Sequence, residues 1–400
     1  MTEAIPTDST IQRSAAIDVL RALVMLLMIF VNDLWSLKGV PAWLEHVSPG
    51  VDGMGLADTV FPAFLFIVGL SLPFAIDARR AKGDSDLRLL FHVAVRGIAL
   101  LVMGVFLVNG ETINREATPF VHGLWEPLAC AAFILVWNAW PRTLAPWLSY
   151  ALRGTGLLIL LILAIIYRGG EGGPIQYFAP QWWGILGLIG WSYLAAGIIA
   201  VLAHGRLVVL IAAWVFFAVL SVAWHAELLP QALDVLPETI IRGTLTGLVM
   251  GGAVIGRLFQ IYRQKSDDRT MTLVFAAIAI ALLLAAQLTR PLWGLSKLDA
   301  TPAWLFLCSA LTLIGFTAIY WLVDVAGKSG WFRLIRPGGT DTLLCYLMPS
   351  FLYALIYGLG LIPPDAFLTG IPGLIKSALF ALLCIVLAGQ LSRFGVCLKL

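Results

Sequence analysis

A small group of polar residues near the start of the chain has side-chain types that proton-transfer chemistry can use. Asn32 and Asp33 end the first apolar run, His46 follows in a loop, and Asp58 opens the second run. A histidine acts as a base when a neighbouring group fixes its tautomer and raises its basicity. Two interpretations stay open. Either Asp58 or Asp33 orients a catalytic His46, or His46 is a solvated loop histidine and Asp58 stabilises a helix N-terminus.

Other ionisable residues lie inside apolar runs, where an unpaired charge costs several kcal/mol. Asp18 and Arg21 are three residues apart on one helix face. They form either an anchoring ion pair or a cation near a cytoplasmic anionic ligand. Glu126 and Arg242 either pair with each other or line a polar cavity. The glycines of 243–256 are spaced four apart, which predicts close helix packing.

The composition excludes a water-soluble globule. Of the 400 residues, 60% are hydrophobic and 12% charged, and the mean hydropathy is +0.92. Soluble domains have about 45–50% apolar and about 25% charged residues. The net charge of +3 is too small to indicate a nucleic-acid partner. The five cysteines show no CxxC spacing, so we expect neither a disulfide framework nor a metal site.

The apolar runs predict an all-α, polytopic membrane helix bundle, because a spanning helix needs roughly 20 apolar residues. About twelve transmembrane helices are predicted, near 16–35, 56–76, 87–108, 121–140, 149–167, 182–203, 207–224, 239–258, 271–289, 302–323, 341–360 and 372–391. No loop is long enough for a second domain, so residues 1–400 form one transmembrane domain.

The distribution of Lys and Arg predicts that both termini are cytoplasmic. With the N-terminus inside, 17 of the 26 basic residues lie in inside segments and six in outside segments. Residues 1–15 then form a cytoplasmic tail, and the first run is an uncleaved anchor. His46 falls on the outer side, and the basic loops 79–88 and 257–269 fall on the inner side.

Several motifs resemble the heparan-α-glucosaminide N-acetyltransferase family. Residues 17–23 (IDVLRAL) are similar to its LDxxRG opening, and 30–32 (FVN) to its VN helix end. His46 in WLEH resembles the family's loop histidine. Residues 55–69 (GLADTVFPAFLFIVG) closely match GLTxADLVFPxFLFIxG, which is the most specific signal. Weaker similarities lie in 184–193, 296–304 and 341–346.

Departures from the family pattern are also present. The family's Gln-Arg pair is Gly187-Leu188 here, its Asn before Lys297 is Ser296, and its Asn in the penultimate helix is Asp341. The family core has about ten spans, so 121–167 is interpreted as an inserted pair of helices. These differences are typical of a sequence-divergent bacterial branch, which implies a multi-pass protein of the bacterial inner membrane.

The resemblance implies an enzyme that moves an acetyl or similar acyl group from cytoplasmic acetyl-CoA to a sugar or glycan on the far side of the bilayer. By resemblance, His46 is the key catalytic residue and Asn32 assists it. Asp58 is a candidate partner that orients the imidazole. We expect the donor to be held by Arg21, Arg79, Arg80, Arg242 and Lys297. Its slender arm would run through the bundle toward His46. No metal is expected, and a homodimer is plausible.

Two rival functions remain open. Twelve spans with both termini inside is a common plan for a secondary transporter of a small polar solute. A non-catalytic scaffold or lipid-handling protein is the other, and it would tolerate loss of His46, Asn32 and Asp58. Binding of acetyl-CoA separates an acyltransferase from both.

Overall fold

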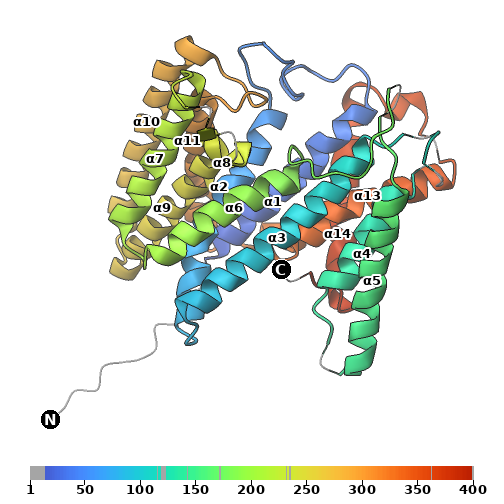
Figure 1. Cartoon of the computed structure of the whole chain (residues 1–400). Helices are drawn as coiled ribbons and strands as arrows, with labels where there is room; N and C mark the ends of the chain where they lie inside the picture. The colour runs from blue at the N-terminus through green and yellow to red at the C-terminus, as the bar shows by residue number, and fades with distance from the viewer. Residues whose placement is uncertain are drawn as a thin grey trace.

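A computed structural model describes residues 14–114, 116–118, 123–141, 143–170, 173–230, 232–233, 236–361 and 363–398. Within these residues the chain is helical, with only isolated β-bridges (Figure 1). The α-helices are α1 (Ala15–Asp33), α2 (Ala57–Arg80), α3 (Asp86–Glu111), α4 (Trp125–Trp137), α5 (Pro146–Ile166), α6 (Ile185–Leu202), α7 (Leu207–His225), α8 (Glu238–Ile241), α9 (Thr244–Lys265), α10 (Asp268–Trp293), α11 (Pro302–Tyr320), α12 (Arg336–Thr340), α13 (Thr342–Gly358) and α14 (Gly370–Arg393). The predicted tail 1–15 lies almost entirely outside the described residues.

Each of the twelve predicted apolar runs contains a helix, which confirms the all-α membrane bundle. Ten of these helices are long and apolar enough to cross a membrane. The other two are shorter: α4 has 13 residues and α13 has 17. At 1.5 Å per residue they extend about 20 Å and about 26 Å, less than the roughly 30 Å hydrocarbon core. The helix α4 also begins later than predicted, so Glu126 is in its first turn.

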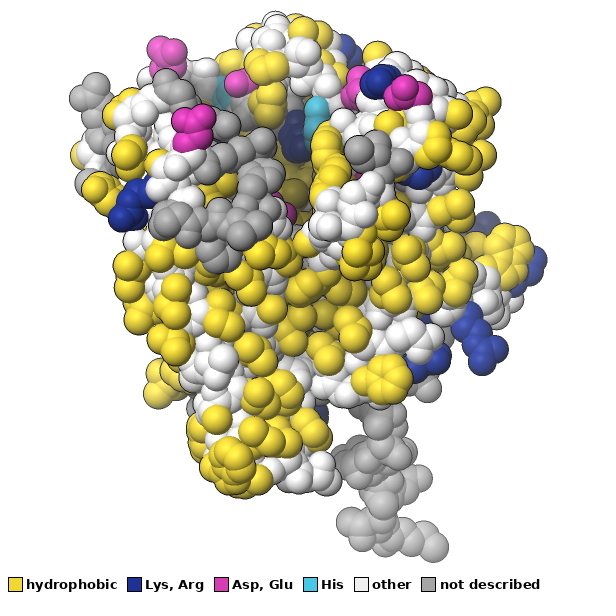
Figure 2. Space-filling model, turned by 90° about the vertical axis from the view of Figure 1, so that its right-hand side faces the viewer, with side chains coloured by type: hydrophobic (Ala, Val, Ile, Leu, Met, Phe, Trp, Pro, Cys, Tyr) yellow, Lys and Arg dark blue, Asp and Glu magenta, His cyan; other side chains and the backbone are white. Residues whose placement is uncertain are grey.

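Side chains on the outer helices face away from the protein, as lipid contact requires. Within their most apolar windows, only 17% of α5, 22% of α7 and 28% of α10 is buried. On the face of the molecule shown in Figure 2, hydrophobic side chains cover the middle. The pair α4 and α5 packs mainly on itself at one edge of the bundle (Figure 1). Its description as an insertion stays a prediction.

The centre of the bundle depends on glycine. A Cβ at Gly69 of α2 would overlap the carbonyl of Val249 on α9, and one at Gly252 would overlap the carbonyl of Phe66. The two helices therefore pack backbone to backbone over this stretch. This contact explains the glycine spacing of α9 as close helix packing.

The connecting loops gather at two ends of the bundle. At one end, which we call the His46 end, the loop 37–56 bonds to other connections: Lys38 N–H donates to Leu368 O, and Gly53 N–H donates to Leu295 O. The opposite end, the Arg79 end, contains the turn after α2 and the turns 203–206 and 266–267. The described chain begins and ends there, because α1 starts and α14 finishes at that end. The position of both described ends at one end of the bundle agrees with an even number of membrane-spanning segments.

Candidate active site

His46 lies in the loop that joins α1 to α2, and the loop is held by backbone contacts. The N–H of Leu56 donates to Trp43 O, and the N–H of Ala57 donates to Leu44 O. Leu44 is buried and anchors the loop to the bundle. A Cβ at Gly55 would overlap the carbonyl of Glu45, so only glycine fits where the loop closes. The loop therefore fixes His46 beside the start of α2, with 46% of its side chain exposed.

Asp58 is the direct partner of His46. Its Oδ1 lies 2.6 Å from His46 Nδ1, and its side chain is only 3% exposed. Its Oδ2 accepts N–H groups from Val47 and Gly55, each at 3.1 Å. The carboxylate also sits in the first turn of α2, where the helix dipole favours a negative charge. A carboxylate held in this way places the imidazole proton on Nδ1 and leaves the lone pair of Nε2 for chemistry.

Lys297 completes a three-residue cluster with this pair. It comes from the connection between α10 and α11, and its Nζ lies 3.3 Å from Nδ1 and 3.4 Å from Nε2 of His46. Burial lowers the pKa of Lys297, while the nearby Asp58 carboxylate opposes that effect. The sequence predicts that Lys297 binds the acyl donor, and this stays a prediction. In the structure Lys297 lies at the His46 end, beside the imidazole.

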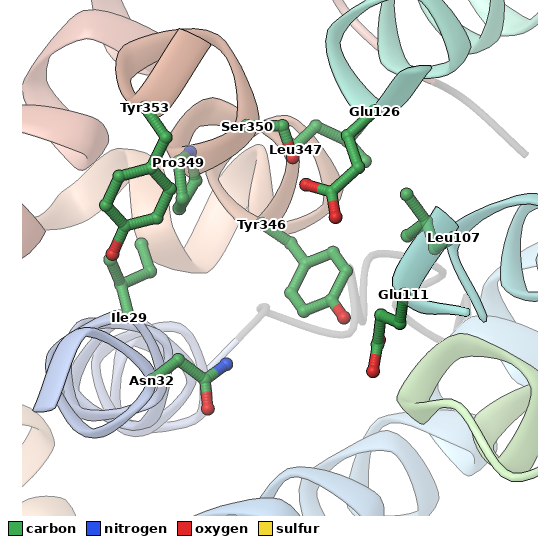
Figure 3. Close-up of a pocket in the computed structure, with 10 residues that line it drawn as sticks. All are labelled: Ile29, Asn32, Leu107, Glu111, Glu126, Tyr346, Leu347, Pro349, Ser350 and Tyr353. Atoms are coloured by element: carbon green, nitrogen blue, oxygen red, sulfur yellow. The ribbon is translucent and has the colours of Figure 1, made fainter. Parts of the chain in front are cut away.

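Asn32 lines a separate cavity of about 150 Å³ between α1, α3, α4 and α13. Figure 3 shows the carboxylates of Glu111 and Glu126 and the hydroxyl of Tyr346 directed into this space. Because α3 ends and α4 begins here, the cavity lies toward the His46 end. Figure 2 shows a hollow at this end, with histidine and Lys or Arg side chains at its walls.

Asp33 does not contact His46, which resolves the two candidates for the imidazole partner in favour of Asp58. The Asp33 side chain is 1% exposed and forms an ion pair with Lys376 of α14 at 2.7 Å. The Tyr353 hydroxyl donates to it at 2.5 Å. Lys376 also donates to Ser36 at 2.7 Å. This buried cluster fixes the end of α1 and so positions the neighbouring Asn32.

Comparison with known proteins supports the resemblance seen in the sequence. A family model described as heparan-alpha-glucosaminide N-acetyltransferase, catalytic, matches residues 13–165. The human heparan-alpha-glucosaminide N-acetyltransferase is 25% identical over 379 residues, covering 84% of this chain and 52% of the human protein. The mouse protein of the same name is 27% identical over 210 residues, covering 45% of this chain and 30% of its own.

The chain is similar in sequence to the human and mouse heparan-alpha-glucosaminide N-acetyltransferases. It spans about half the length of the human protein that it matches. The matched range 13–165 contains His46, Asp58 and Asn32, together with Glu111 and Glu126 of the cavity. Lys297 lies outside that range but within the described structure.

The remaining residues predicted to bind the donor are engaged in contacts within the protein. Arg21 of α1 donates to Gly339 O and to the Ser71 hydroxyl, and it forms an ion pair with Asp18 at 3.4 Å. This pair is the anchoring interaction that the sequence left as one of two alternatives. Arg79 pairs with Asp84 at 2.9 Å. A donor phosphate at Arg79 would therefore compete with a carboxylate.

Arg80 also belongs to the Arg79 end. It pairs with Asp86 at 2.7 Å and donates to Val201 O. Arg21, Arg79 and Arg80 all occupy the half of the bundle opposite to His46. The cavity near them, which Asp77 and Arg257 line, shares no lining residue with the Asn32 cavity. The route of the donor through the bundle stays a prediction.

Of the alternatives for Arg242, the pairing with Glu126 is not found among the described contacts, and binding of the donor by Arg242 stays a prediction. Arg242 forms an ion pair with Glu238 one helical turn away and packs against the Trp224 ring. It follows α8, so it lies toward the His46 end. Glu126 instead faces Glu111 across the cavity. Glu111 was not among the residues predicted from the sequence, and Tyr346 was noted only within the family-like segment 341–346, because only the packing of α3 and α13 brings them to Asn32.

Proposed function

We propose that this protein is a membrane-embedded acyltransferase that moves an acetyl or similar acyl group from acetyl-CoA to a sugar or glycan acceptor. The observation that carries the proposal is the His46–Asp58 pair, which presents an oriented and half-exposed imidazole at one end of a membrane bundle. The names of the human and mouse relatives, which are N-acetyltransferases of a glucosaminide, support the same chemistry. We place the protein in the bacterial inner membrane.

His46 performs the proton transfer in this proposal. In one route, its Nε2 removes a proton from the acceptor amine or hydroxyl as the acceptor attacks the thioester carbonyl carbon. The carbon–sulfur bond then breaks, and the CoA thiolate takes the proton from the imidazolium. For Asn32 to donate to the carbonyl oxygen while negative charge develops on it, the acyl group has to lie between His46 and the Asn32 cavity. A positioned base contributes about 10²–10⁴-fold, and one such donor about 10²–10³-fold.

A second route uses His46 as the nucleophile. Here Nε2 attacks the thioester carbonyl, the CoA thiolate leaves, and an acetyl-imidazole forms. The acceptor then attacks that acetyl group and releases the imidazole, and its displaced proton passes to solvent or to Asp58. Both routes use the same oriented Nε2. Rapid quenching with radiolabelled acetyl-CoA separates them, because only the second leaves label on the protein.

We propose that the donor approaches from the cytoplasm at the Arg79 end and that the acceptor approaches from the opposite side. The excess of Lys and Arg in the loops of the Arg79 end supports this orientation. The Asn32 cavity at the other end supplies the polar groups that an acceptor with several hydroxyl or amine groups requires. Acyl transfer would then occur without passage of acetyl-CoA across the bilayer.

The central test measures CoA thiol release by the protein in nanodiscs, with acetyl-CoA and a panel of amino sugars. We expect acceptor-dependent release by the natural protein and none by His46→Ala. His204→Ala is the matched control, because His204 also contacts a carboxylate, that of Asp86 at 2.8 Å, but at the opposite end. A folded His46→Ala protein with full activity would refute the role of His46. Absence of both turnover and acetyl-CoA binding in the natural protein would refute the proposed function.

A further inference from the structure

Lys297 lies beside the His46 ring without a direct hydrogen bond to Asp58 among the described contacts. Its Nζ is nearly equidistant from the two ring nitrogens, at 3.3 and 3.4 Å. An atom that is this close to both ring nitrogens cannot lie along the in-plane lone-pair direction of either nitrogen. The Lys297 ammonium therefore lies over the ring. The lone pair of Nε2 therefore remains accessible in the ring plane.

The connection that carries Lys297 is tied to the His46 loop. Asp52 of that loop accepts the N–H of Leu295 at 2.7 Å, and it forms an ion pair with Arg290 at 3.0 Å. The N–H of Gly53 donates back to Leu295 O at 3.0 Å. Two segments that are more than 200 residues apart thus form one unit. This unit determines the separation between the ammonium and the imidazole.

The buried Asp58 carboxylate needs one positive charge nearby, since an uncompensated charge at such a site is costly. In the part of the chain that the structure describes, two cationic groups adjoin it: the His46 imidazole, when protonated, and Lys297. The other groups that face this site do not supply the charge. Glu45 and Asp299 are exposed acids, Arg290 is engaged by Asp52, and the buried Cys308 thiol of α11 contacts Met54.

We propose that Lys297 is a positioning residue that balances the charge of Asp58 and thereby keeps His46 neutral and ready to act. This role is distinct from the predicted contact with acetyl-CoA. It rests on the proposed function, because a neutral imidazole matters only if His46 acts as base or nucleophile. Without the ammonium, His46 itself becomes the counter-ion of Asp58 and retains a proton. Its Nε2 is then blocked at neutral pH.

The perturbation is the removal of this one charge. Lys297→Met keeps most of the aliphatic stem but not the cation, and Lys297→Arg keeps the cation. A unit charge within 4 Å of a half-exposed ring shifts a protonation equilibrium by about one to two pH units. In Lys297→Met, the acidic limb of the pH–rate profile should move to higher pH by that amount, and activity should be recovered at high pH. Lys297→Arg should stay close to the natural profile.

A second readout does not depend on turnover. Diethyl pyrocarbonate acylates only the neutral imidazole, and mass spectrometry of the His46 peptide gives the extent of labelling at each pH. The labelling midpoint should rise by about one to two pH units in Lys297→Met. The His204 peptide of the same digest is the internal control, and its midpoint should not move. Unchanged His204 labelling also shows that the variant is folded.

The outcomes separate the two proposals. A shifted labelling midpoint in a protein that transfers no acyl group supports the charge role of Lys297 and refutes the acyltransferase function. An unshifted midpoint in an active Lys297→Met protein overturns the role proposed for Lys297. A loss of activity that is equal at every pH, with unchanged labelling, shows that Lys297 only supports the local structure and likewise overturns it.

Discussion

Replacing Asp58 by asparagine removes the charge that orients His46 while keeping the size of the side chain. The 2.6 Å contact joins a buried carboxylate to the imidazole. A hydrogen bond to a charged group contributes about 1.5–3 kcal/mol. If that energy is lost in the transition state, kcat falls roughly 10- to 150-fold. We therefore expect Asp58→Asn to retain a small but measurable rate.

The same substitution should also lower the stability of the loop. Asp58 Oδ2 accepts two backbone N–H groups, from Val47 and Gly55, while Oδ1 faces the imidazole. An asparagine has one oxygen, so its NH₂ group must face either these donors or the imidazole. A buried donor left without an acceptor costs about 1–3 kcal/mol. The melting temperature in detergent should fall accordingly.

The pH profile of Asp58→Asn gives an independent test. Without the carboxylate the imidazolium loses its counter-ion, so the acidic limb should move to lower pH. This direction is opposite to that expected for Lys297→Met. Initial rates of CoA thiol release across the pH range measure both the shift and the drop in kcat.

Asp52→Asn is the matched control for Asp58→Asn. Asp52 lies in the same loop, but half of its side chain is exposed. Its bonds to Leu295 N and Arg290 hold its pKa below the usual range. It contacts the segment that carries Lys297 and not His46 itself, so its replacement should lower kcat much less than Asp58→Asn does. An Asp58→Asn protein with kcat within twofold of the natural enzyme and an unshifted profile would refute the reasoning about the His46–Asp58 pair.

Two further predictions concern the bundle and the Asn32 cavity. Gly69→Ala should destabilise the protein by about 1–3 kcal/mol, because its Cβ would overlap the Val249 carbonyl. The control is Gly154→Ala, which should not lower the melting temperature, because the new Cβ would lie in open space. An equal response of the two variants would contradict the close contact of α2 and α9. The double variant with Glu111→Gln and Glu126→Gln should raise the KM for a cationic acceptor about tenfold, with a smaller change in kcat. A tenfold change corresponds to a loss of roughly 1.4 kcal/mol of binding free energy. Glu116→Gln is the control for this pair, and an unchanged KM would exclude the cavity as the acceptor site.

The sequence by itself determined the class of fold and the most local part of the site. The length and composition of the apolar runs predict spanning helices, because hydrocarbon excludes unpaired backbone groups along any long segment. His46 and Asp58 are twelve residues apart on adjoining segments, so a short loop suffices to join them. The short lengths of α4 and α13 were not apparent, because their flanking residues are also apolar.

Only the tertiary structure decided the rest, since it depends on helices that are distant in sequence. Lys297 reaches His46 across 251 positions, and Lys376 reaches Asp33 across a still larger separation. Glu111, Glu126 and Tyr346 meet Asn32 only where α3, α4 and α13 converge. Arg242 is the exception, because its partner Glu238 lies four residues earlier, a local spacing that the sequence already contains. Hydropathy is a local property of the chain, whereas the pairing of charges is set by which helices pack together.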